Sequence, residues 1–249
     1  ATQVSIGAGF TLLGGGSPKA AHCASNNGFV MLANTDTSAD QVWWSALYNY
    51  ASWTPSIATE AGNVRLLEAP GPITALIEFR DGFVAFKDNA LFVGEYVGPN
   101  YLWRWRMLSN RIGCVGGKAV AELDGKLYFM HTSGFYEFDG QTIRNVGLSV
   151  NQTVLTAALY VDIPGRVTTA SNVYDGLQYV QAGADDIEGV VWFRVTTYYV
   201  LTSKYVTTFW SYNPRSQKWG QYAGTGTNDN DTRPAIVRAS SADIQAFKA

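Results

Sequence analysis

The stretch that decides the fold is Ile73–Met107, which reads ITALIEFRDGFVAFKDNALFVGEYVGPNYLWRWRM. Short runs rich in β-branched and aromatic residues alternate in it with turn residues. Asp81–Gly82 lies between two apolar runs and is a strong hairpin signal, because this turn needs positive φ at its central residues. Turns at Lys87–Asn89 and Gly98–Asn100 follow. The stretch predicts four antiparallel strands, at residues 73–79, 83–86, 90–93 and 103–107, which together have the size of one propeller blade.

The same pattern repeats in Ala119–Val146. Asp124–Gly125 separates its first two apolar runs, as Asp81–Gly82 does upstream, and Asp139–Gly140 precedes its last run. The predicted strands are residues 119–123, 126–130, 135–138 and 142–146. Because the two stretches align strand for strand, the sequence contains a repeated four-stranded unit.

Partial copies of the unit flank these two. Further strands are predicted at residues 28–32, 42–47, 189–195, 207–212 and 218–222. One large side chain is expected just beyond the last turn of each unit, and these are Trp53, Trp103, Ile143 and Trp219. Their uneven spacing indicates an insertion at about residues 147–189.

A period of about 40 to 50 residues with four strands per unit is typical of a β-propeller. One four-stranded sheet cannot cover both of its faces, so such sheets stack radially and cover one another. We therefore predict an all-β protein in which residues 1–249 form a single β-propeller of four-stranded antiparallel blades. Strand-like pieces at 4–6, 10–13, 235–238 and 244–247 predict that the termini complete a further blade, for about five blades. A fragment of a longer chain is the alternative.

Composition limits the partners. The chain has 249 residues, a formal net charge of -2 and only 15% charged residues. Proteins that capture nucleic acid usually carry a basic excess, and the densest basic spot here is only Arg104, Arg106 and Arg111. A channel through which DNA merely passes needs no such excess. No apolar run reaches the length of about 18 residues that a membrane-spanning helix needs.

Metal and cofactor motifs are weak. His22, Cys23, Cys114 and His131 are the only histidines and cysteines, and His22 with Cys23 has no second pair at ligand spacing, so a zinc site would need carboxylates from elsewhere. His131 is expected to face solvent or to cap a turn, and the cysteines to be small buried residues. The glycines at 7, 9 and 14–16 lack the spacing of phosphate-binding loops. We predict no cofactor and no metal.

Catalytic motifs are weak as well, and we predict that the chain is not an enzyme. No Gly-x-Ser-x-Gly elbow is present. Glycan-cleaving propellers place carboxylates around a pore, and the candidates here precede glycines in turns, which explains them without catalysis: Asp81, Asp124, Asp139 and Asp175. A second acidic group, Asp185, Asp186 and Glu188, is a solvated loop or a calcium or ligand site. Asn151 and Asn230 begin glycosylation triplets of a kind that also arises by chance.

Aromatic residues are the remaining signal. They occur as adjacent or alternating pairs: Trp43 with Trp44, Trp103 with Trp105, and Tyr198 with Tyr199. Adjacent strand residues point to opposite faces of a sheet. We expect these side chains either to fill the gaps between blades or, at an outer rim, to anchor a protein interface.

Three strings resemble the tail hub or nozzle proteins of short-tailed bacteriophages, also called packaged-DNA stabilisation proteins. These strings are Val42–Pro55, Gly71–Leu76 and Gly134–Gly140. The resemblance covers about 105 residues, and no functional residue is carried over from it. It implies a propeller-bearing subunit of a ring, usually a hexamer, at the distal end of a virion tail. Such rings close or extend the DNA exit channel and attach adaptor proteins, fibres or spikes.

The sequence therefore predicts a structural virion tail protein that forms a homo-oligomeric ring and contacts DNA only in passage. The alternative is a carbohydrate-binding or glycan-hydrolysing propeller, with tryptophan and tyrosine as sugar platforms and Asp185 or Asp186 as an acid. A propeller interaction scaffold inside a cell is a further alternative.

Overall fold

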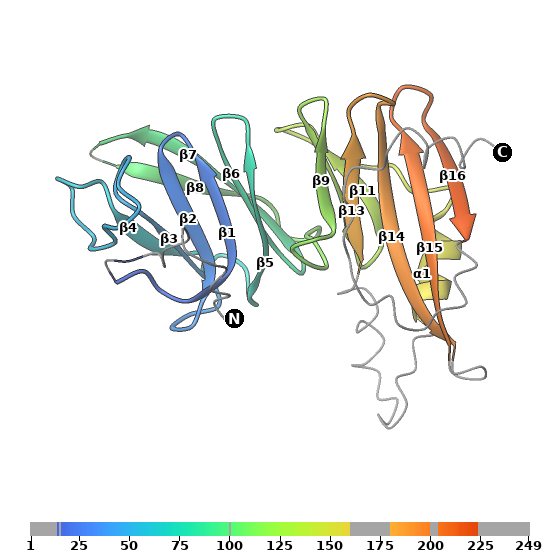
Figure 1. Cartoon of the computed structure of the whole chain (residues 1–249), viewed down its shortest axis with the longest axis horizontal. Coiled ribbons are helices and arrows are strands. Elements are labelled where there is room, and N and C mark those ends of the chain that lie inside the picture. The colour runs from blue at the N-terminus through green and yellow to red at the C-terminus, as the bar shows by residue number, and fades with distance from the viewer. Residues whose placement is uncertain (1–13, 15, 100, 160–179, 200–203, 224–249) are drawn as a thin grey trace, which may run out of the picture. The chain divides into compact units, whose positions relative to one another are not determined.

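The structure, a computed structural model, describes residues 14, 16–99, 101–159, 180–199 and 204–223. This described part is all-β, with four sheets of four antiparallel strands and one helix (Figure 1). Strand order within each sheet follows chain order, so every sheet is a meander. The predicted all-β class and the four-stranded antiparallel unit are confirmed.

The first sheet consists of β1 (Ala20–Asn26), β2 (Phe29–Thr35), β3 (Gln41–Trp44) and β4 (Gly62–Arg65). The second sheet consists of β5 (Ile73–Phe79), β6 (Gly82–Lys87), β7 (Ala90–Gly98) and β8 (Leu102–Ser109). The third sheet consists of β9 (Val120–Leu123), β10 (Lys126–His131), β11 (Gly134–Phe138) and β12 (Ile143–Asn145). The fourth sheet consists of β13 (Gln181–Asp185), β14 (Val190–Tyr199), β15 (Lys204–Asn213) and β16 (Lys218–Ala223). The helix, α1 (Asn151–Leu159), follows β12 in the chain.

The chain divides into two compact units, residues 1–117 and 118–249. In unit 1 the first and second sheets meet mainly through β1, β2 and β5. His22 on β1 places Nε2 3.2 Å from the carbonyl oxygen of Ile73 on β5, and Asn26 donates to the carbonyl of Arg80 at 2.7 Å. The first strands of the two sheets therefore lie together.

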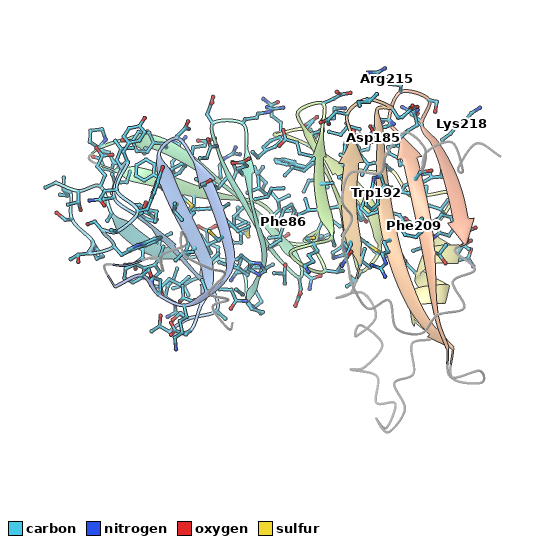
Figure 2. The ribbon with its side chains drawn as sticks, in the orientation of Figure 1. Phe86, Asp185, Trp192, Phe209, Arg215 and Lys218 are labelled. Carbon is cyan, nitrogen blue, oxygen red and sulfur yellow. The ribbon has the colours of Figure 1, made fainter. Side chains whose placement is uncertain are left out.

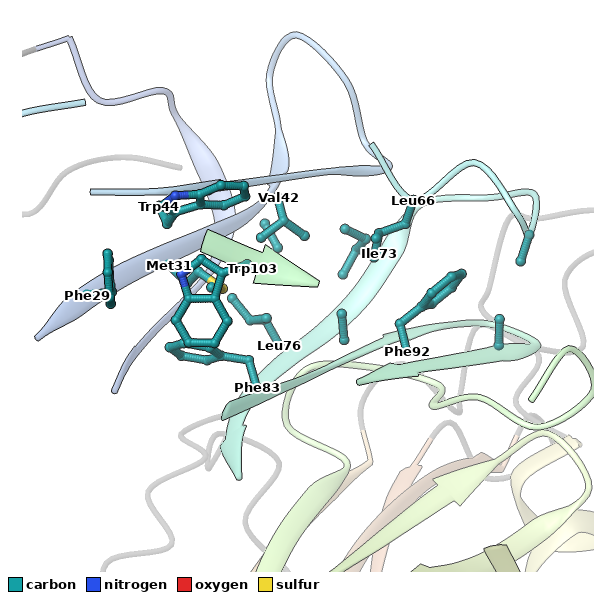
Figure 3. Packing of buried hydrophobic residues seen from close by; sticks show 14 residues of the cluster. Phe29, Met31, Val42, Trp44, Leu66, Ile73, Leu76, Phe83, Phe92 and Trp103 are labelled. Atoms are coloured by element: carbon teal, nitrogen blue, oxygen red, sulfur yellow. The ribbon is translucent and has the colours of Figure 1, made fainter. Parts of the chain in front are cut away.

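Aromatic side chains fill the rest of the space between these two sheets (Figure 3). Phe29 and Phe83 pack edge-on against Trp103 of β8, with ring centroids 5.5 and 5.1 Å apart. The small Ala24 on β1 packs against this core where the first strands of the two sheets lie together. The two sheets thus lie closest at their first strands, and bulky residues such as Trp44 and Trp103 fill the space toward their later strands.

Unit 2 is built in the same way. β13 lies beside β9, and the main-chain N–H of Ala182 donates to the carbonyl of Lys118 at 2.7 Å. Phe135 of the third sheet contacts Phe193 of the fourth at 4.5 Å between ring centroids. On the fourth strands, the indole N–H of Trp219 donates to the carbonyl of Val146 at 2.8 Å, which bridges β16 to the end of β12.

Glycines inside strands accept tryptophan rings from the neighbouring strand. Gly62 lies opposite Trp44, Gly94 opposite Trp105, and Gly183 opposite Trp192. A Cβ atom at these glycines would approach ring atoms to 2.6, 2.8 and 2.5 Å respectively, closer than such contacts allow. The rings therefore cover glycine backbone that has no side chain of its own to pack.

Three of the four matching large residues lie on fourth strands as predicted, on β8, β12 and β16. The prediction is wrong for Trp53, which lies in the long β3–β4 connection, because the fourth strand of the first sheet is Gly62–Arg65. The interval 147–189 contains α1 and also β13, which is the first strand of the fourth sheet. Residues 4–6, 10–13, 235–238 and 244–247 lie outside the described part of the chain.

The two aligned Asp-Gly turns differ in register. In the β9–β10 hairpin, Leu123 pairs with Lys126, so Asp124 and Gly125 are the central residues, with φ of 52° and 70°. In the β5–β6 hairpin, Phe79 pairs with Gly82, so the central residues are Arg80 and Asp81, and the positive φ, 54°, is at Arg80. Gly82 instead lies in β6, where a Cβ would meet the carbonyl oxygen of Gly94 at 2.3 Å. Its role is close backbone approach rather than turn geometry.

Candidate functional site

The long β3–β4 connection of unit 1, residues 45–61, contains one charged residue, Glu60, near its end. Between Asp40 and Glu60 the sequence contains no acidic, basic or histidine residue. Trp53 anchors the connection, since its side chain is 1% exposed and its indole N–H donates to the carbonyl of Tyr50 at 2.8 Å. Isolated bridges pair Ala46 with Asn49 and Ser56 with Ala61. The connection is therefore an ordered loop with its own small core.

Large side chains project from this loop and from the β7–β8 turn. Tyr48, Tyr50 and Ile57 on the loop are 76%, 50% and 71% exposed, and Val97 and Tyr101 at the turn are 40% and 82% exposed. We call these five residues the tyrosine platform. Exposed apolar and aromatic residues gathered at one place commonly mark a contact surface.

Glu60 ties the loop to the turn beneath the platform. Its carboxylate accepts a hydrogen bond from the Tyr96 hydroxyl at 2.6 Å, and its main-chain carbonyl accepts one from the indole N–H of Trp44 at 3.0 Å. The hydrogen bond to Glu60 raises the pKa of Tyr96 to about 12. This hydrogen bond therefore joins the loop to β7.

Backbone strain is concentrated at the same place. Tyr48, Glu60 and Leu102 adopt positive φ of 53°, 61° and 53°, a conformation that is unfavourable for bulky residues. The Tyr48 N–H donates to the carbonyl of Gly28 at 2.8 Å, and its ring lies where a Gly28 Cβ would be, 2.5 Å from that position. Such strain persists where surrounding contacts hold it, and it often occurs at functional surfaces.

A buried carboxylate forms the second polar cluster, in unit 2. The side chain of Glu137 on β11 is 6% exposed and lies 3.2 Å from Lys126 Nζ and 3.1 Å from Arg144. Tyr128, opposite Glu137 on β10, also hydrogen-bonds to it, and burial together with this carboxylate raises the pKa of Tyr128. Because three donors surround it, the carboxylate has the arrangement of a structural ion pair.

A histidine and two hydroxyls meet at the β10–β11 turn. His131 Nδ1 accepts the main-chain N–H of Ser133 at 3.1 Å and lies 2.7 Å from Ser133 Oγ, which in turn lies 2.8 Å from the Tyr136 hydroxyl. Burial lowers the pKa of His131. The predicted capping role is confirmed, but the predicted solvent-facing position is wrong, since His131 is 5% exposed. With its Nδ1 occupied by the turn, this histidine holds the hairpin.

The described acidic candidates occupy turns. Asp139 accepts the main-chain N–H groups of Gln141 and Thr142 at 2.8 and 2.7 Å, and these bonds, with one from the Thr142 hydroxyl, lower its pKa to about 2. Asp185 accepts the N–H groups of Ile187 and Glu188 at 2.9 and 3.1 Å. These contacts match the turn chemistry expected of aspartates.

No group of three or more His, Cys, Asp or Glu residues that could hold a metal is present among the residues that the structure describes. Asp81 and Asp124 lie in hairpin turns. Asp175, Asn230 and the glycines at 7, 9 and 15 lie outside the described part.

The other sequence candidates have structural partners. His22 contacts β5, and Gly14 and Gly16 lie ahead of β1. Cys114 is buried as expected, while Cys23 is exposed, contrary to the expectation. Asn151 begins α1, and its side chain accepts the N–H of Phe135 at 3.1 Å and donates to Asn145. This side chain is thus occupied by protein contacts.

The adjacent pair Trp43 and Trp44 divides between the two sheet faces as predicted, whereas the alternating pair Trp103 and Trp105 lies on one face. Trp44 and Trp103 are buried in the core of unit 1, and Trp43 is half-buried on the opposite face. The half-buried Trp105 packs on the core side with Trp103. Trp192 and Phe209, labelled in Figure 2, lie on the face of the fourth sheet opposite the buried Phe193, with their rings 6.4 Å apart. Tyr198 and Tyr199 belong to β14.

No family model matches the chain, and no curated protein sequence matches it. Within the described residues, no helix is long and apolar enough to cross a membrane.

The sequence interpretation missed the platform and the Glu137 cluster. Tyr48 and Tyr50 belong to Val42–Pro55, one of the three strings that carry the resemblance to tail proteins, and no separate role was predicted for them. The available signal was the charge-free interval between Asp40 and Glu60, since interface centres are depleted of charged residues and enriched in aromatic ones.

Proposed function

We propose that the chain is a β-propeller structural protein of a phage tail, a hub or nozzle subunit that joins copies of itself in a ring around the DNA exit channel. The observation that supports a propeller is that the two sheets of each unit lie closest at their first strands and diverge toward their fourth strands. In both units the first strands of two sheets lie together, while large aromatic residues fill the space toward the fourth strands. Stacking of this kind is what radial packing of blades requires.

The first and fourth sheets also carry aromatic residues on the face away from the core of their own unit, which supports further stacking. In the first sheet, Trp43 lies beside Leu32 on the face opposite the unit 1 core. In the fourth sheet, Trp192 and Phe209 lie on the face opposite Phe193 (Figure 2). A sheet with aromatic residues on both faces needs cover on both. The proposed propeller has about five blades.

The tail assignment rests on the sequence resemblance of three strings. Val42–Pro55 covers β3 and the first part of the platform loop, Gly71–Leu76 covers the start of β5, and Gly134–Gly140 covers β11 and its turn. Adaptor proteins, fibres or spikes are the expected tail partners, and DNA is expected to pass without specific binding.

Cryo-electron microscopy of the purified chain tests both parts of this proposal. We expect each subunit to appear as a wheel of radial sheets and the copies to form closed rings with a central opening. A subunit whose sheets stack in two flat layers would contradict the propeller. Subunits that never form rings, alone or with purified tails, would contradict the tail function.

A further inference from the structure

We propose that β8 binds an extended acidic segment of another protein, which adds to the second sheet as a further strand and pairs its carboxylates with Arg104 and Arg106. This binding depends neither on ring formation nor on the tail assignment, so it goes beyond the proposed function. It rests on the edge of β8 that faces away from β7, on the charge of this strand and on the contrast with the other fourth strands.

The outer edge of β8 is open to strand addition. β8 is the last strand of the second sheet, and in the part of the chain that the structure describes it pairs with β7 alone. The first sheet meets the second at β5, on the opposite edge. The main-chain N–H and carbonyl groups of a strand point alternately to its two sides, so those of β8 that do not face β7 lack a strand partner. An extended segment supplies such a partner.

β8 is also the longest of the fourth strands. β4, β12 and β16 have four, three and six residues, whereas β8 has eight. Within β8, Trp103–Met107 pairs with β7 in unbroken register. Proteins commonly protect a sheet edge by keeping its strand short. β4 and β12 are protected in this way and β8 is not, so β8 offers a regular stretch against which a partner can pair.

The charge of β8 restricts the partner. Arg104 and Arg106 project from one face of the sheet, since they are two residues apart on a strand, and their side chains are 64% and 54% exposed. Glu95 on β7 lies 2.6 Å from Nη2 of Arg104 and 3.9 Å from Nη2 of Arg106. It is the only acidic residue on these two strands, so one carboxylate faces two guanidinium groups.

An added strand places its own side chains directly opposite these two arginines. Carboxylates at those positions form favourable cross-strand pairs, and a guanidinium group can bind a carboxylate through two parallel hydrogen bonds. Trp105 and Met107 lie on the other face, where they are partly buried against the core. The matching segment therefore alternates acidic residues, opposite the arginines, with apolar residues, opposite Trp105 and Met107.

The same charge argues against a second β8 as the occupant. Two copies of β8 that pair edge to edge and continue both faces of the sheet place arginine opposite arginine, and like charges in this position destabilise a sheet. DNA phosphates would satisfy the arginines but would leave the main-chain groups of the edge without a strand partner. An acidic polypeptide satisfies both, and this favours it over DNA.

β16 supplies a matched control. It is the next longest fourth strand, with Lys218 at its start and Arg215 in the turn before it. Both side chains are exposed, and Arg215 lies 4.0 Å from Asp124. Replacing these two residues by glutamine removes the same charge from the chain as replacing the two arginines of β8, but at another sheet edge.

Isothermal titration calorimetry of the whole chain tests the binding. The probe is the heptapeptide Glu-Val-Glu-Val-Glu-Val-Glu, blocked at both ends, and we expect a dissociation constant on the order of 50 µM. The variant Arg104→Gln/Arg106→Gln should bind it at least about tenfold more weakly. The control Arg215→Gln/Lys218→Gln should bind it like the parent, and circular dichroism melts would verify that both variants fold.

Two further measurements separate strand addition from attraction between charges alone. The peptide should slow hydrogen exchange of main-chain N–H groups of β8, because they then donate to the added strand. Peptides with N-methylated valines or with N-methylated glutamates keep every carboxylate, but each lacks the donors on one side of the strand. At least one of these two peptides should fail to bind.

The inference is overturned by a chain that does not bind the peptide at about 1 mM, by an Arg104→Gln/Arg106→Gln variant that binds it like the parent, or by β8 exchange that the peptide leaves unchanged. Duplex DNA that binds through the two arginines while the peptide does not would also overturn it. Rings that form without peptide binding would remove only this inference. Peptide binding by a chain that never forms rings would remove only the proposed function.

Discussion

The two units each bury a charged side chain, and they satisfy it in different ways. Lys87 at the end of β6 is 1% exposed and donates to the main-chain carbonyls of Leu66 and Ala69 at 2.7 and 2.6 Å. Glu137 in unit 2 has side-chain partners, and Arg144 and Lys126 are 50% and 40% exposed. The partners of Lys87 are buried main-chain carbonyls, whereas the Lys126 and Arg144 side chains that pair with Glu137 can rotate into solvent. The cost of removing a buried charge depends on whether its partners can find another environment.

Lys87 substitutions should therefore have the largest effect. Lys87→Ala leaves two buried carbonyls without a donor and opens a cavity, so we expect a loss of about 3–5 kcal/mol in the free energy of unfolding. Lys87→Met keeps the volume and should lose about 1–3 kcal/mol, for the carbonyls alone. Urea titration followed by tryptophan fluorescence measures both.

Leu91→Ala, another fully buried position in the second sheet, is the control for a cavity without stranded polar groups. Lys87→Met as stable as the parent would show that the carbonyls of Leu66 and Ala69 find other donors, and the comparison with Glu137 would fail.

Glu137→Gln should have a smaller effect, about 1–2 kcal/mol. The amide retains an acceptor for Tyr128, and Lys126 and Arg144 can move into solvent. Glu137→Leu should cost about 1 kcal/mol more, because the buried Tyr128 hydroxyl then loses its acceptor. Thermal melts monitored by circular dichroism would give the order. A loss for Glu137→Gln larger than that for Lys87→Met would reverse the comparison.

The difference between inner and edge strands explains how much of the fold the sequence predicted. Inner strands such as β6 and β10 have β-branched and aromatic runs between turn residues, and their positions were predicted closely, whereas β7 was predicted at its start but extends five residues further, to Gly98. β1 (AAHCASN), β4 (GNVR) and β13 (QAGAD) were missed. These strands have weak intrinsic β preference and form because a strong neighbour pairs with them, assisted by Trp44 over Gly62 and by Trp192 over Gly183.

The burial of Lys87 and Glu137 was not predicted from the sequence, for a related reason. Lys87 was assigned to a turn with Asp88 and Asn89, which separate two apolar runs, and lysine is seldom buried in proteins. In the structure β6 extends over Gly82 and Lys87 beyond the predicted residues 83–86, and the Lys87 side chain is buried, where it donates to Leu66 and Ala69. Which carbonyls need a donor is a property of the β4–β5 connection and cannot be seen in the local sequence. The turn aspartates were predictable because their partners are two or three residues away.

The pH dependence of stability in the alkaline range is a further test of the buried Lys87. Burial lowers the pKa of Lys87 below its ordinary value of 10.5. Between the lowered value and 10.5, the unfolded chain holds a proton that the folded protein has released, so this residue's destabilising contribution disappears as pH rises. Tyr96, whose pKa is raised to about 12, acts in the opposite direction above pH 10. Both proteins share Tyr96, so the stability of the parent relative to Lys87→Met should increase as pH approaches 10.5. A constant difference in urea midpoints across this range would contradict the buried position of the ammonium group.

The smallest effect is expected at an exposed acidic turn. The pKa of Asp139 is lowered to about 2 by hydrogen bonds from Thr142 and Gln141. Its folded pKa is below the ordinary 3.8, so its contribution to stability is present above pH 3.8 and is lost as pH falls toward 2. Asp139→Asn retains an acceptor for the two N–H groups but cannot titrate, so its stability should depend less on pH between 4 and 2 than the parent's. Thr142→Val removes one of the three donors and should fall between the two. Equal acid dependence in all three proteins would mean that this turn opens before the Asp139 carboxylate is protonated. Local backbone hydrogen bonds would then hold an exposed carboxylate far less firmly than buried partners hold the charges of Lys87 and Glu137.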